Sequence, residues 1–463
     1  MGHLYISAAH KSSGKTTLSI GLCAALQEDG DIVQPFKKGP DYIDPLWLAQ
    51  AAGRSCYNLD FYTMHREEIS ALFAEKMRGA DIGLIEGNKG LYDGLALDGS
   101  NSNAALAAQL GSPIVLVLDS QGMTRGVAPL ILGYQAFDPS ISIVGVILNK
   151  VGGSRHEAKL RAVIEHYTDV KVVGAVQRSD ELVIDERHLG LVPSNELDQG
   201  RAHIQRMSRL IRDQVDLDAL RDLSGQGRAL PDLEVPAAVS PPPHDSVKIA
   251  YACDSAFGFY YAGDLESLRA AGAELIPFSP LRDPELPACD GLFLGGGFPE
   301  THMQALEGNV GMRDAVCRFV ERDGPVYAEC GGLMYLCERL TWDGNTRKMA
   351  GVIPAGVTMH AKPQGRGYVR LRETASHPWP STEAGSHNDA IAAHEFHYSA
   401  LNEIPDGFAF AYSVERGYGL DGKHDGLRYR NLLASYAHLR DTRSHPWAKR
   451  FVSFVRDCRD GLA

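Results

Sequence analysis

Cys330 lies in a stretch whose residue types suit covalent catalysis. The sequence AECGG (residues 328–332) follows an apolar run and places small residues on both sides of the thiol. A nucleophile on a sharp strand-to-helix turn needs small neighbours, because the backbone is crowded there. The N-terminus of a following helix would also favour the thiolate form of the cysteine. We therefore interpret Cys330 as a nucleophile rather than as an inert buried thiol.

A cysteine nucleophile requires a general base, which is usually a histidine distant in sequence. His394 and His397 in AHEFHYS are candidates, but His438 ends the apolar, strand-like run LLASYAH late in the chain. Enzymes with a nucleophile elbow carry their base at such a position, so His438 is the preferred base. An oxyanion hole also needs backbone N–H donors, and the turn LFLGGGFPE (292–300) is glycine-rich. The residues expected to form it are Gly296, Gly297 and Gly331.

The segment AAHKSSGKTT (8–17) joins the first expected strand to the first expected helix. It contains A-x-x-x-x-G-K-T, a phosphate-binding loop with Ala9 in place of the first glycine. Backbone N–H groups and the helix N-terminus would surround phosphate oxygens. Lys15 would reach the β- and γ-phosphates of a nucleotide, and Thr16 would bind Mg²⁺. The nucleotide-binding set is Ser12, Ser13, Gly14, Lys15, Thr16, Thr17 and Asn149; Asn149 either contacts the adenine edge or is a strand-end turn residue.

Acidic residues follow other expected strands. Glu86 ends an apolar strand, where a phosphate-loop sheet presents a metal-binding acid, so Thr16 and Glu86 form the expected Mg²⁺ site. Asp41 and Asp44 lie in KKGPDYIDP (37–45), and Asp93 lies in a glycine-rich loop. These are more acids than one Mg²⁺ needs. Some are expected to orient a second substrate or to neutralise charge during phosphoryl transfer. Lys37 and Lys38 either attract an anionic substrate or simply solubilise the surface.

These residues need α/β domains to position them. Residues 3–9, 32–38, 82–87, 113–119, 143–151 and 171–176 read as strands, and residues 15–30 as a helix ended by Gly30. Continuous apolar strands separated by helices predict a parallel sheet covered on both faces. The pattern stops near Leu223. We predict a phosphate-loop domain over 1–222, a linker over 223–246 with five prolines, and a second α/β domain over 247–463.

The bulk composition excludes several classes of protein. The chain has 463 residues, 44% hydrophobic and 22% charged, and this length predicts two domains. A net charge of −12 argues against non-specific nucleic-acid binding. No apolar run approaches the ~20 residues of a membrane span, and the start has no signal-peptide pattern. None of the eight cysteines forms a C-x-x-C pair, so we expect a cytoplasmic protein with reduced thiols.

Taken together, the motifs resemble those of a known family. The second domain is similar to class I glutamine amidotransferases of the triad type, and the whole chain resembles the cobyrinic acid a,c-diamide synthase family. The matching stretches are SSGKTT, FKKGPDYIDP, EGNKGLYDG, LGGGFPE, PVYAECGGLMYL, HEFHYS and SYAHL. The resemblance implies ATP-dependent amidation of the a and c acetate carboxylates of a modified tetrapyrrole, through an acyl phosphate and with ammonia from glutamine.

The resemblance also assigns roles to single residues. It implies that Cys330 is the nucleophile and His438 its base. It places Lys15, Thr16 and Glu86 in the ATP–Mg²⁺ site, and it puts the carboxylate-activating site at three acids, Asp41, Asp44 and Asp93.

Two departures from the family pattern stand out. Arg440 occupies the position, two after the histidine, where triad amidotransferases often carry an acid, so the third member of the thiol site is left open. Lys89 replaces a usually apolar residue, and DGSNSNAAL (98–106) is unusual for a corrin enzyme, so the ring is left open between a corrin and sirohaem.

Three other functions are alternatives for this sequence. The first is a sirohaem amidase of sulfur metabolism. The second is a non-enzymatic partition-type ATPase fused to an inactive amidotransferase-like module, although HKSSGKT lacks the Gly-Gly of such ATPases. The third is an enzyme of the cobyric acid synthase type, which generally resembles this chain less in GPDYIDP. A homodimer is also left open.

Overall fold

The computed structural model describes residues 2–462, apart from 183, 185, 188, 189, 197–199, 230–245, 380–389 and 405. The chain divides into two compact units, Met1–Val235 and Pro236–Ala463. The first two residues of the expected linker belong to helix α8 (Leu217–Ser224), and most of that linker, residues 230–245, lies outside the described residues. Among the described helices, none has the length and apolar character needed to cross a bilayer.

The first unit is built on a seven-stranded sheet in the order β3-β2-β4-β1-β5-β6-β7, and every pairing in it is parallel. Its strands are β1 (Gly2–Ala8), β2 (Val33–Lys38), β3 (Tyr57–Leu59), β4 (Ile82–Glu86), β5 (Ile114–Asp119), β6 (Ile143–Val151) and β7 (Lys171–Gln177). The predicted parallel sheet is confirmed. Only β3, which has three residues, was not predicted, because so short a strand carries no periodic signal.

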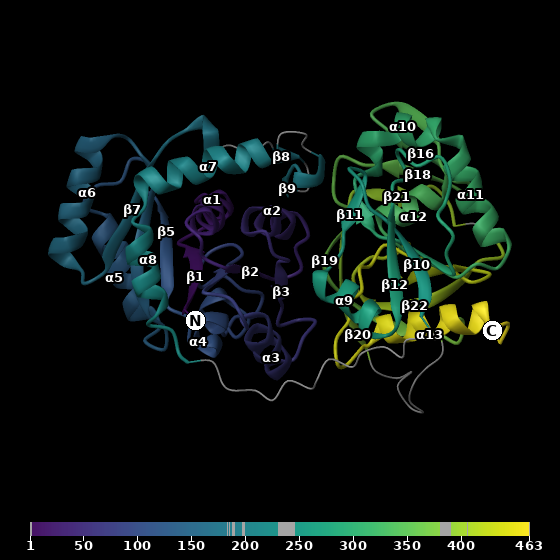
Figure 1. The fold of residues 1–463 in the computed structure, drawn as a ribbon, viewed down its shortest axis with the longest axis horizontal. Helices are drawn as coiled ribbons and strands as arrows, with labels where there is room; N and C mark the ends of the chain where they lie inside the picture. Colours follow the sequence, from purple (N-terminus) through teal and green to yellow (C-terminus); the bar gives the residue numbers. More distant parts are fainter. Residues whose placement is uncertain are drawn as a thin grey trace. The chain divides into compact units, whose positions relative to one another are not determined.

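Helices cover both faces of this sheet. They are α1 (Lys15–Glu28), α2 (Ile43–Ala52), α3 (Arg66–Lys76), α4 (Asn103–Leu110), α5 (Val127–Phe137), α6 (Ser154–Tyr167), α7 (Gly200–Gln214) and α8. Right-handed crossovers place α1 and α2 on one face and α3 to α6 on the other. Helix α7 lies alongside α1 (Figure 1). The contact is close at Gly21, where a β-carbon would lie 2.6 Å from Cγ1 of Ile211. Two short strands, β8 (Glu186–Arg187) and β9 (Gly190–Leu191), pair antiparallel.

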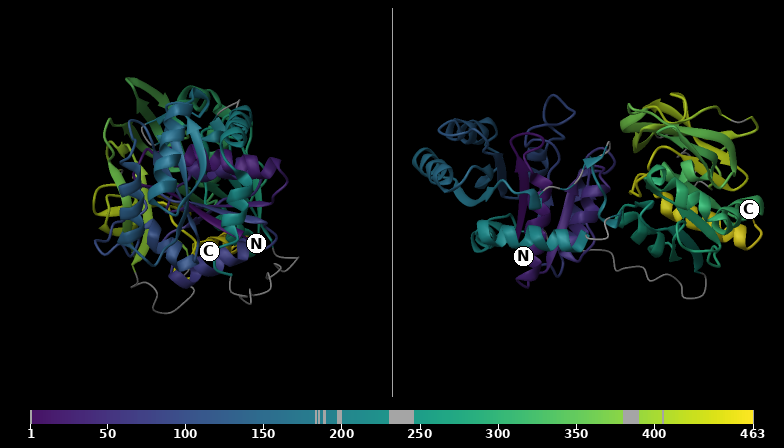
Figure 2. Two further views of the ribbon diagram at one scale, coloured as in Figure 1. Left: turned by 90° about the vertical axis from the view of Figure 1, so that its left-hand side faces the viewer. Right: turned by 90° about the horizontal axis from the view of Figure 1, so that it is seen from above.

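The second unit contains a nine-stranded sheet in the order β12-β10-β13-β15-β24-β23-β22-β19-β20. The half from β12 to β24 is parallel, and the half from β24 to β20 is antiparallel. Figure 2 shows the antiparallel strands, in light green and yellow, gathered in one layer. The sheet strands are β10 (Val247–Ala252), β12 (Ala273–Phe278), β13 (Gly291–Leu294), β15 (Val326–Glu329), β19 (Gly365–Glu373), β20 (Ile391–His397), β22 (Ala409–Arg416), β23 (His424–Tyr429) and β24 (Leu432–Ser435).

Smaller elements complete the second unit. The sheet β17-β16-β18-β21 consists of β16 (Cys337–Trp342), β17 (Asn345–Lys348), β18 (Ile353–Met359) and β21 (Ser399–Leu401), and β11 (Phe257–Phe259) pairs with β14 (Gly296–Gly297). The helices are α9 (Ala262–Ala270), α10 (Met303–Gly308), α11 (Val310–Glu321), α12 (Gly331–Leu336) and α13 (Trp447–Arg459). The apolar run before Cys330 forms β15, and the strand-like run LLASYAH contains β24, whereas the antiparallel strands β19, β20, β22 and β23 were not predicted.

Aromatic packing fixes the central strand β15. Tyr327 is fully buried and stacks on Phe293, with ring centroids 5.2 Å apart, while Trp447 of α13 contacts the same ring at 5.0 Å. Such aromatic contacts add to the free energy already gained by burying the rings. Because β15 is packed against both β13 and α13, the residues at its carboxyl end have a fixed position.

Backbone crowding at the start of α12 explains its second glycine. A β-carbon on Gly332 would lie 2.0 Å from the carbonyl oxygen of Leu294 in β13. A contact that short with backbone forces β13 and α12 apart. Gly332 is therefore required by packing between a strand and a helix.

We predict that Gly332→Ala lowers the free energy of unfolding of the second unit by roughly 1–3 kcal/mol or more, as overpacking does. Urea denaturation followed by circular dichroism measures the change. The matched control is Gly308→Ala, because a β-carbon at Gly308 would meet no neighbouring atom within 4 Å. Equal stability of the two variants would contradict the packing argument.

Candidate active sites

Cys330 lies at the turn between β15 and α12. Its φ of 45° and ψ of −97° fall outside the regions that non-glycine residues favour. Its N–H donates to the carbonyl oxygen of Ser435 in β24 over 2.7 Å, which fixes the strained backbone. The side chain is 8% exposed. A strained strand-to-helix residue of this kind has the geometry of a nucleophile elbow.

His438 is the histidine that the fold brings to Cys330. Its ring forms side-chain hydrogen bonds with Cys330 and with Glu329. His394 lies beside it, with ring centroids 6.1 Å apart, and the two residues exchange backbone hydrogen bonds. His397 is engaged elsewhere, because it stacks on Tyr436 at 3.8 Å and its Nδ1 lies 2.8 Å from the carbonyl oxygen of Ser399. Of the three histidine candidates, the geometry favours His438.

Glu329 is a site residue that sequence reasoning missed. Its Oε2 lies 3.1 Å from Nδ1 of His438, and both side chains are almost fully buried. Successive side chains of a strand point to opposite faces, so the residue before the nucleophile is not expected on the same side. The positive φ at Cys330 breaks that alternation. Only this local turn, which sequence does not specify in detail, brings the two neighbours to one imidazole.

The pKa of His438 rises to about 10. Burial by itself lowers the pKa of the imidazole, but its hydrogen bonds with Cys330 and Glu329 outweigh that effect. The ordinary pKa is about 6.5, so the proton on His438 stabilises the folded unit fully below that pH. This contribution is lost as the pH rises through about 10. A protonated imidazole beside a thiol favours the thiolate, which is the reactive form.

The three glycines expected to form the oxyanion hole converge on this site. A β-carbon on Gly331 would lie 2.9 Å from the backbone nitrogen of Gly297, and one on Gly296 would lie 2.7 Å from Cε1 of His438. The first hydrogen bond within α12 runs from Met334 N to the Cys330 carbonyl oxygen, so the N–H of Gly331 has no acceptor within the helix. The glycine turn after β13 therefore lies against both the start of α12 and the ring of His438.

The phosphate loop spans residues 9–14, between β1 and α1. Ser12 and Gly14 have positive φ values of 67° and 85°, which turn the backbone sharply before the helix. The hydroxyl of Ser13 donates to the carbonyl oxygen of His10 over 2.8 Å, so this side chain shapes the loop. Lys15 donates from Nζ to the carbonyl oxygen of Lys89 over 2.6 Å. Burial lowers the pKa of this lysine.

Asn149 braces the same loop. Its Nδ2 donates to the carbonyl oxygen of Ser13 over 2.9 Å, and its Oδ1 accepts from the N–H of Lys150 over 2.9 Å. A β-carbon on Gly14 would lie only 2.2 Å from the same Nδ2, which shows how closely loop and side chain pack. Contact of Asn149 with adenine stays a prediction.

A buried cluster of one ammonium and two carboxylates lies under the loop. Lys37 Nζ is 2.5 Å from Oδ2 of Asp44 and 3.1 Å from Oε1 of Glu86, and Lys37 is 3% exposed. The hydroxyl of Thr16 donates to the same Glu86 oxygen over 2.6 Å. Burial lowers the pKa of Lys37, but the attraction of Asp44 and Glu86 outweighs it, and the pKa rises well above its usual value.

The donors of this cluster fit a small hard cation. The second carboxylate oxygen of Glu86 is buried without a hydrogen-bond partner. The other oxygen of the same carboxylate accepts from the Thr16 hydroxyl, which also lies 3.3 Å from Asp44, and oxygen atoms are the ligands that Mg²⁺ prefers. Histidines, cysteines and acids alone form no group of three able to hold a metal within the described part of the chain. Mg²⁺ commonly completes its shell with phosphate oxygens and water, so the residues present fit it.

The two other predicted acids have local partners. Asp41 accepts hydrogen bonds from the N–H groups of Ile43 and Asp44 at the start of α2, and its Oδ2 lies 3.9 Å from Lys37 Nζ. Asp93 is exposed and accepts from the N–H of Gly90 over 2.9 Å. The fold therefore joins Asp44 to the Thr16–Glu86 cluster, places Asp41 at its edge, and puts Asp93 in the neighbouring loop.

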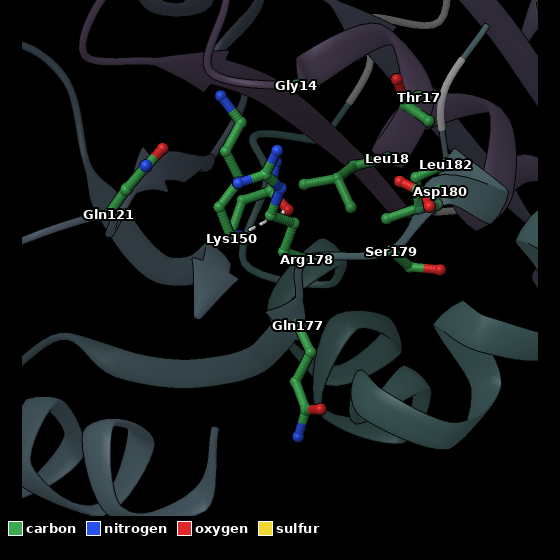
Figure 3. Close-up of a pocket in the computed structure, with 11 residues that line it drawn as sticks. Gly14, Thr17, Leu18, Gln121, Lys150, Gln177, Arg178, Ser179, Asp180 and Leu182 are labelled. Atoms are coloured by element: carbon green, nitrogen blue, oxygen red, sulfur yellow. Dashed lines mark hydrogen bonds between the residues drawn. The ribbon is translucent and has the colours of Figure 1, made fainter. Parts of the chain in front are cut away.

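A pocket of about 370 Å³ adjoins the phosphate loop (Figure 3). Residues of α1 form one wall, and the segment after β7 forms another. The lining residues are Gly14, Thr17, Leu18, Gln121, Asn149, Lys150, Gln177, Arg178, Ser179, Asp180 and Leu182. Because this pocket begins at Gly14 and Thr17, it has the position expected for the nucleoside part of a bound nucleotide.

We predict that Lys37→Met lowers the free energy of unfolding of the first unit by about 3–5 kcal/mol, because it leaves the buried Glu86 and the partly buried Asp44 without their cation. Adding Glu86→Gln should recover much of this loss. Urea denaturation measures both, and hydrogen exchange of peptides from β2 and β4 assigns the change to the first unit. The control is Lys76→Met at a partly exposed ion pair. A Lys37→Met effect no larger than the control effect would disprove the interpretation.

Comparison with known proteins follows the same division of the chain. The family model described as the CobQ/CobB/MinD/ParA nucleotide binding domain matches residues 6–192. The model described as the CobB/CobQ-like glutamine amidotransferase domain matches residues 248–444. These matches agree with the two predicted α/β folds.

Full-length relatives extend the similarity to the whole chain. A protein named cobyrinate a,c-diamide synthase from Magnetococcus marinus is 47% identical over 460 residues, covering 98% of this chain and 97% of its own. Proteins of the same name from Methanosarcina acetivorans and Listeria monocytogenes are 40% identical over 463 residues and 37% identical over 446 residues. Those two alignments cover 94% and 95% of this chain, and 91% and 96% of the relatives. The predicted enzyme class, a carbon–nitrogen ligase with glutamine as amido donor, is confirmed, and the chain belongs to the cobyrinate a,c-diamide synthase family.

Proposed function

We propose that this chain uses ATP and glutamine-derived ammonia to amidate the a and c acetate carboxylates of cobyrinic acid. The observation that carries the proposal is the pairing, in one chain, of a buried thiol–imidazole–carboxylate site with a phosphate loop above a cation–carboxylate cluster. Full-length similarity to proteins named cobyrinate a,c-diamide synthase supports the choice of substrate. The division of labour assigns ammonia release to the second unit and carboxylate activation to the first.

In the second unit, the Cys330 thiolate attacks the side-chain carbonyl carbon of glutamine and forms a C–S bond. The His438 imidazolium gives its proton to the amide nitrogen as the C–N bond breaks, so that this nitrogen leaves as ammonia. Water, deprotonated by His438, hydrolyses the thioester, which releases glutamate and regenerates the thiolate. We assign stabilisation of the oxyanion to backbone N–H groups of Gly296, Gly297 and Gly331. Ammonia is released unprotonated, which is the nucleophilic form.

In the first unit, a substrate carboxylate oxygen attacks the γ-phosphorus of ATP, an O–P bond forms, and ADP leaves. Ammonia then attacks the acyl carbon, phosphate departs, and the amide loses a proton. Lys15 is assigned to the β- and γ-phosphates, where its charge offsets the charge that moves during transfer. When bound, Mg²⁺ would neutralise phosphate charge, and Thr16 and Glu86 are the residues we assign to hold it. We place the site where the substrate carboxylate is activated beside Asp41, Asp44 and Asp93.

The surface beside Asp93 supports a flat, apolar substrate with acidic arms. Leu95 and Leu97 are 56% and 107% exposed, and Tyr92 packs against Phe137 with ring centroids 4.7 Å apart. Exposed apolar groups this large often mark binding sites. The exposed Lys89 adds positive charge to this loop.

The residues that seemed unusual for a corrin enzyme shape the same loop. Asn101 accepts from the N–H of Leu95 over 2.9 Å, and Asn103 donates to the carbonyl oxygen of Gly90 over 2.6 Å. Because Asn101 and Asn103 fix the backbone of this loop, their presence does not argue against a corrin substrate. Family membership leaves the partition-type ATPase without support, and sirohaem is kept as the competing substrate in the test below. Eight free thiols support our proposal of a reducing, cytoplasmic location.

Cys330→Ala should lose glutamine-dependent amidation by roughly 10³-fold or more but retain amidation with ammonium salts, because free ammonia bypasses the thiol. Steady-state assays with each donor measure this difference. Cys253→Ala, which removes an exposed thiol, serves as the control and should keep both activities. Loss of activity with both donors in Cys330→Ala would refute the division of labour.

The substrate is tested by mass spectrometry of products formed with ATP, Mg²⁺ and glutamine. Cobyrinic acid should gain two amide groups in place of two carboxyl groups, whereas sirohaem in a parallel reaction should stay unchanged. Amidation of sirohaem alone would reverse the choice of ring. No product from either ring, in enzyme that hydrolyses glutamine, would contradict the proposed substrate.

A further inference from the structure

The thiol site lacks an acid at the position where triad amidotransferases often carry one. Arg440 stands there, and an arginine has only donors, so it cannot accept a hydrogen bond from an imidazole. Its guanidinium lies over the ring of Tyr261 at 4.4 Å, and its Nε is 3.7 Å from Oδ1 of Asp264. Arg440 therefore belongs to a separate buried cluster, and the group that orients His438 must come from another part of the fold.

Glu329 has the contacts that this role requires. Its Oε2 lies 3.1 Å from His438 Nδ1, while its Oε1 accepts from the hydroxyl of Tyr327 over 2.5 Å and from the N–H of Leu439 over 3.0 Å. Both oxygens are engaged, and the residue is 3% exposed. A carboxylate fixed at both oxygens cannot rotate away from the imidazole. With Nδ1 directed at Glu329, Nε2 is the ring nitrogen left for Cys330.

We propose that Glu329 is the positioning residue of the glutaminase site, holding His438 in the tautomer and orientation that Cys330 requires. The acid thus precedes the nucleophile by one residue instead of following the histidine by two. The inference rests on the proposed function only in that it takes Cys330 as the glutaminase nucleophile. It does not depend on the identity of the tetrapyrrole.

The charges around His438 agree with this assignment. The groups that face its ring are Glu329 from β15, Cys330 from the elbow and His394 from β20. Burial, together with His438 and His397, lowers the pKa of His394 to about 3, so this second imidazole stays neutral and adds no repulsion. Glu329 is then the one carboxylate in contact with His438 among the described hydrogen bonds, and it stabilises the imidazolium.

A purely structural role for Glu329 is the competing explanation. The carboxylate also anchors Tyr327 and the backbone of Leu439, so its loss could simply loosen the site. Tyr327→Phe is the matched control, because it removes one donor to Glu329 and keeps the ring and the contact with His438. Glu395→Gln is a second control, since this buried carboxylate accepts from the N–H groups of Tyr418 and Gly419 and lies 3.5 Å from His397.

The kinetic test measures glutamate release by the full-length enzyme. Glu329→Gln should lower kcat by roughly 10²- to 10⁴-fold with little change in the KM for glutamine, as expected for a wrong tautomer. It should retain ammonia-dependent amidation, which reports an intact first unit. Tyr327→Phe and Glu395→Gln should lose less than about tenfold. A Glu329→Gln variant with wild-type kcat, or one whose whole effect is matched by Tyr327→Phe, would overturn the inference.

A second measurement does not depend on whether any Glu329 variant folds. In wild-type protein labelled with ¹⁵N-histidine, the His438 signal is assigned by its absence from His438→Asn. It should show a protonated Nδ1 and a pKa well above 6.5. An Nδ1 without a proton at neutral pH would overturn the inference even if no Glu329 variant folds. If wild-type enzyme hydrolyses no glutamine at all, the proposed function fails; if only the Glu329 results fail, the proposed function stands.

Discussion

Parallel strands end at a common edge of a sheet, and both units depend on this constraint. In the first unit, β1, β2 and β4 end beside one another, so the phosphate loop, the lysine at the end of β2 and the acid at the end of β4 meet. In the second unit, β15 and β24 are parallel neighbours, and the thiol and the imidazole follow their ends. Residues that are distant in sequence come into contact, because the backbone hydrogen bonds between parallel strands place the ends of these strands side by side.

Burial then determines the charge of each site. Lys37 keeps its proton although it is almost fully buried, because Asp44 and Glu86 lie within hydrogen-bond distance. His438 keeps its proton for the same reason, with a carboxylate on one side and a thiol on the other. An unpaired charge in such surroundings would be strongly unfavourable, so each ion pair holds its side chains in one arrangement. The two sites differ in their charges. At the proposed phosphate site one cation, Lys37, is surrounded by acids, whereas at the thiol site one acid, Glu329, supports one imidazolium.

Close backbone approach is the second requirement of the thiol site. Gly331 and Gly332 lie so near the turn after β13 that any β-carbon would collide with it. In the proposed oxyanion hole, this closeness would let backbone N–H groups approach the substrate carbonyl oxygen, where side chains would otherwise intervene. The strained backbone of Cys330 is maintained by its hydrogen bond to β24 and by the packed aromatic residues of β15. The geometry of the reactive residue is thus set by the surrounding core.

The sequence alone determined the class of both domains, the phosphate loop with Lys15 and Thr16, the acid Glu86, and the pair Cys330 and His438. These depend on local spacing and on the order of strands and helices, which apolar periodicity and glycine positions record. It did not determine the role of Glu329, because strand alternation directs neighbouring residues apart and only the turn at Cys330 reverses this. Nor did it determine the antiparallel half of the large sheet, the bracing of the phosphate loop by Asn149, or the ion pairs of Lys37. Apart from the pair Lys37–Asp44, those contacts join residues far apart in the chain, and only tertiary structure decides which of many possible partners a buried polar group finds.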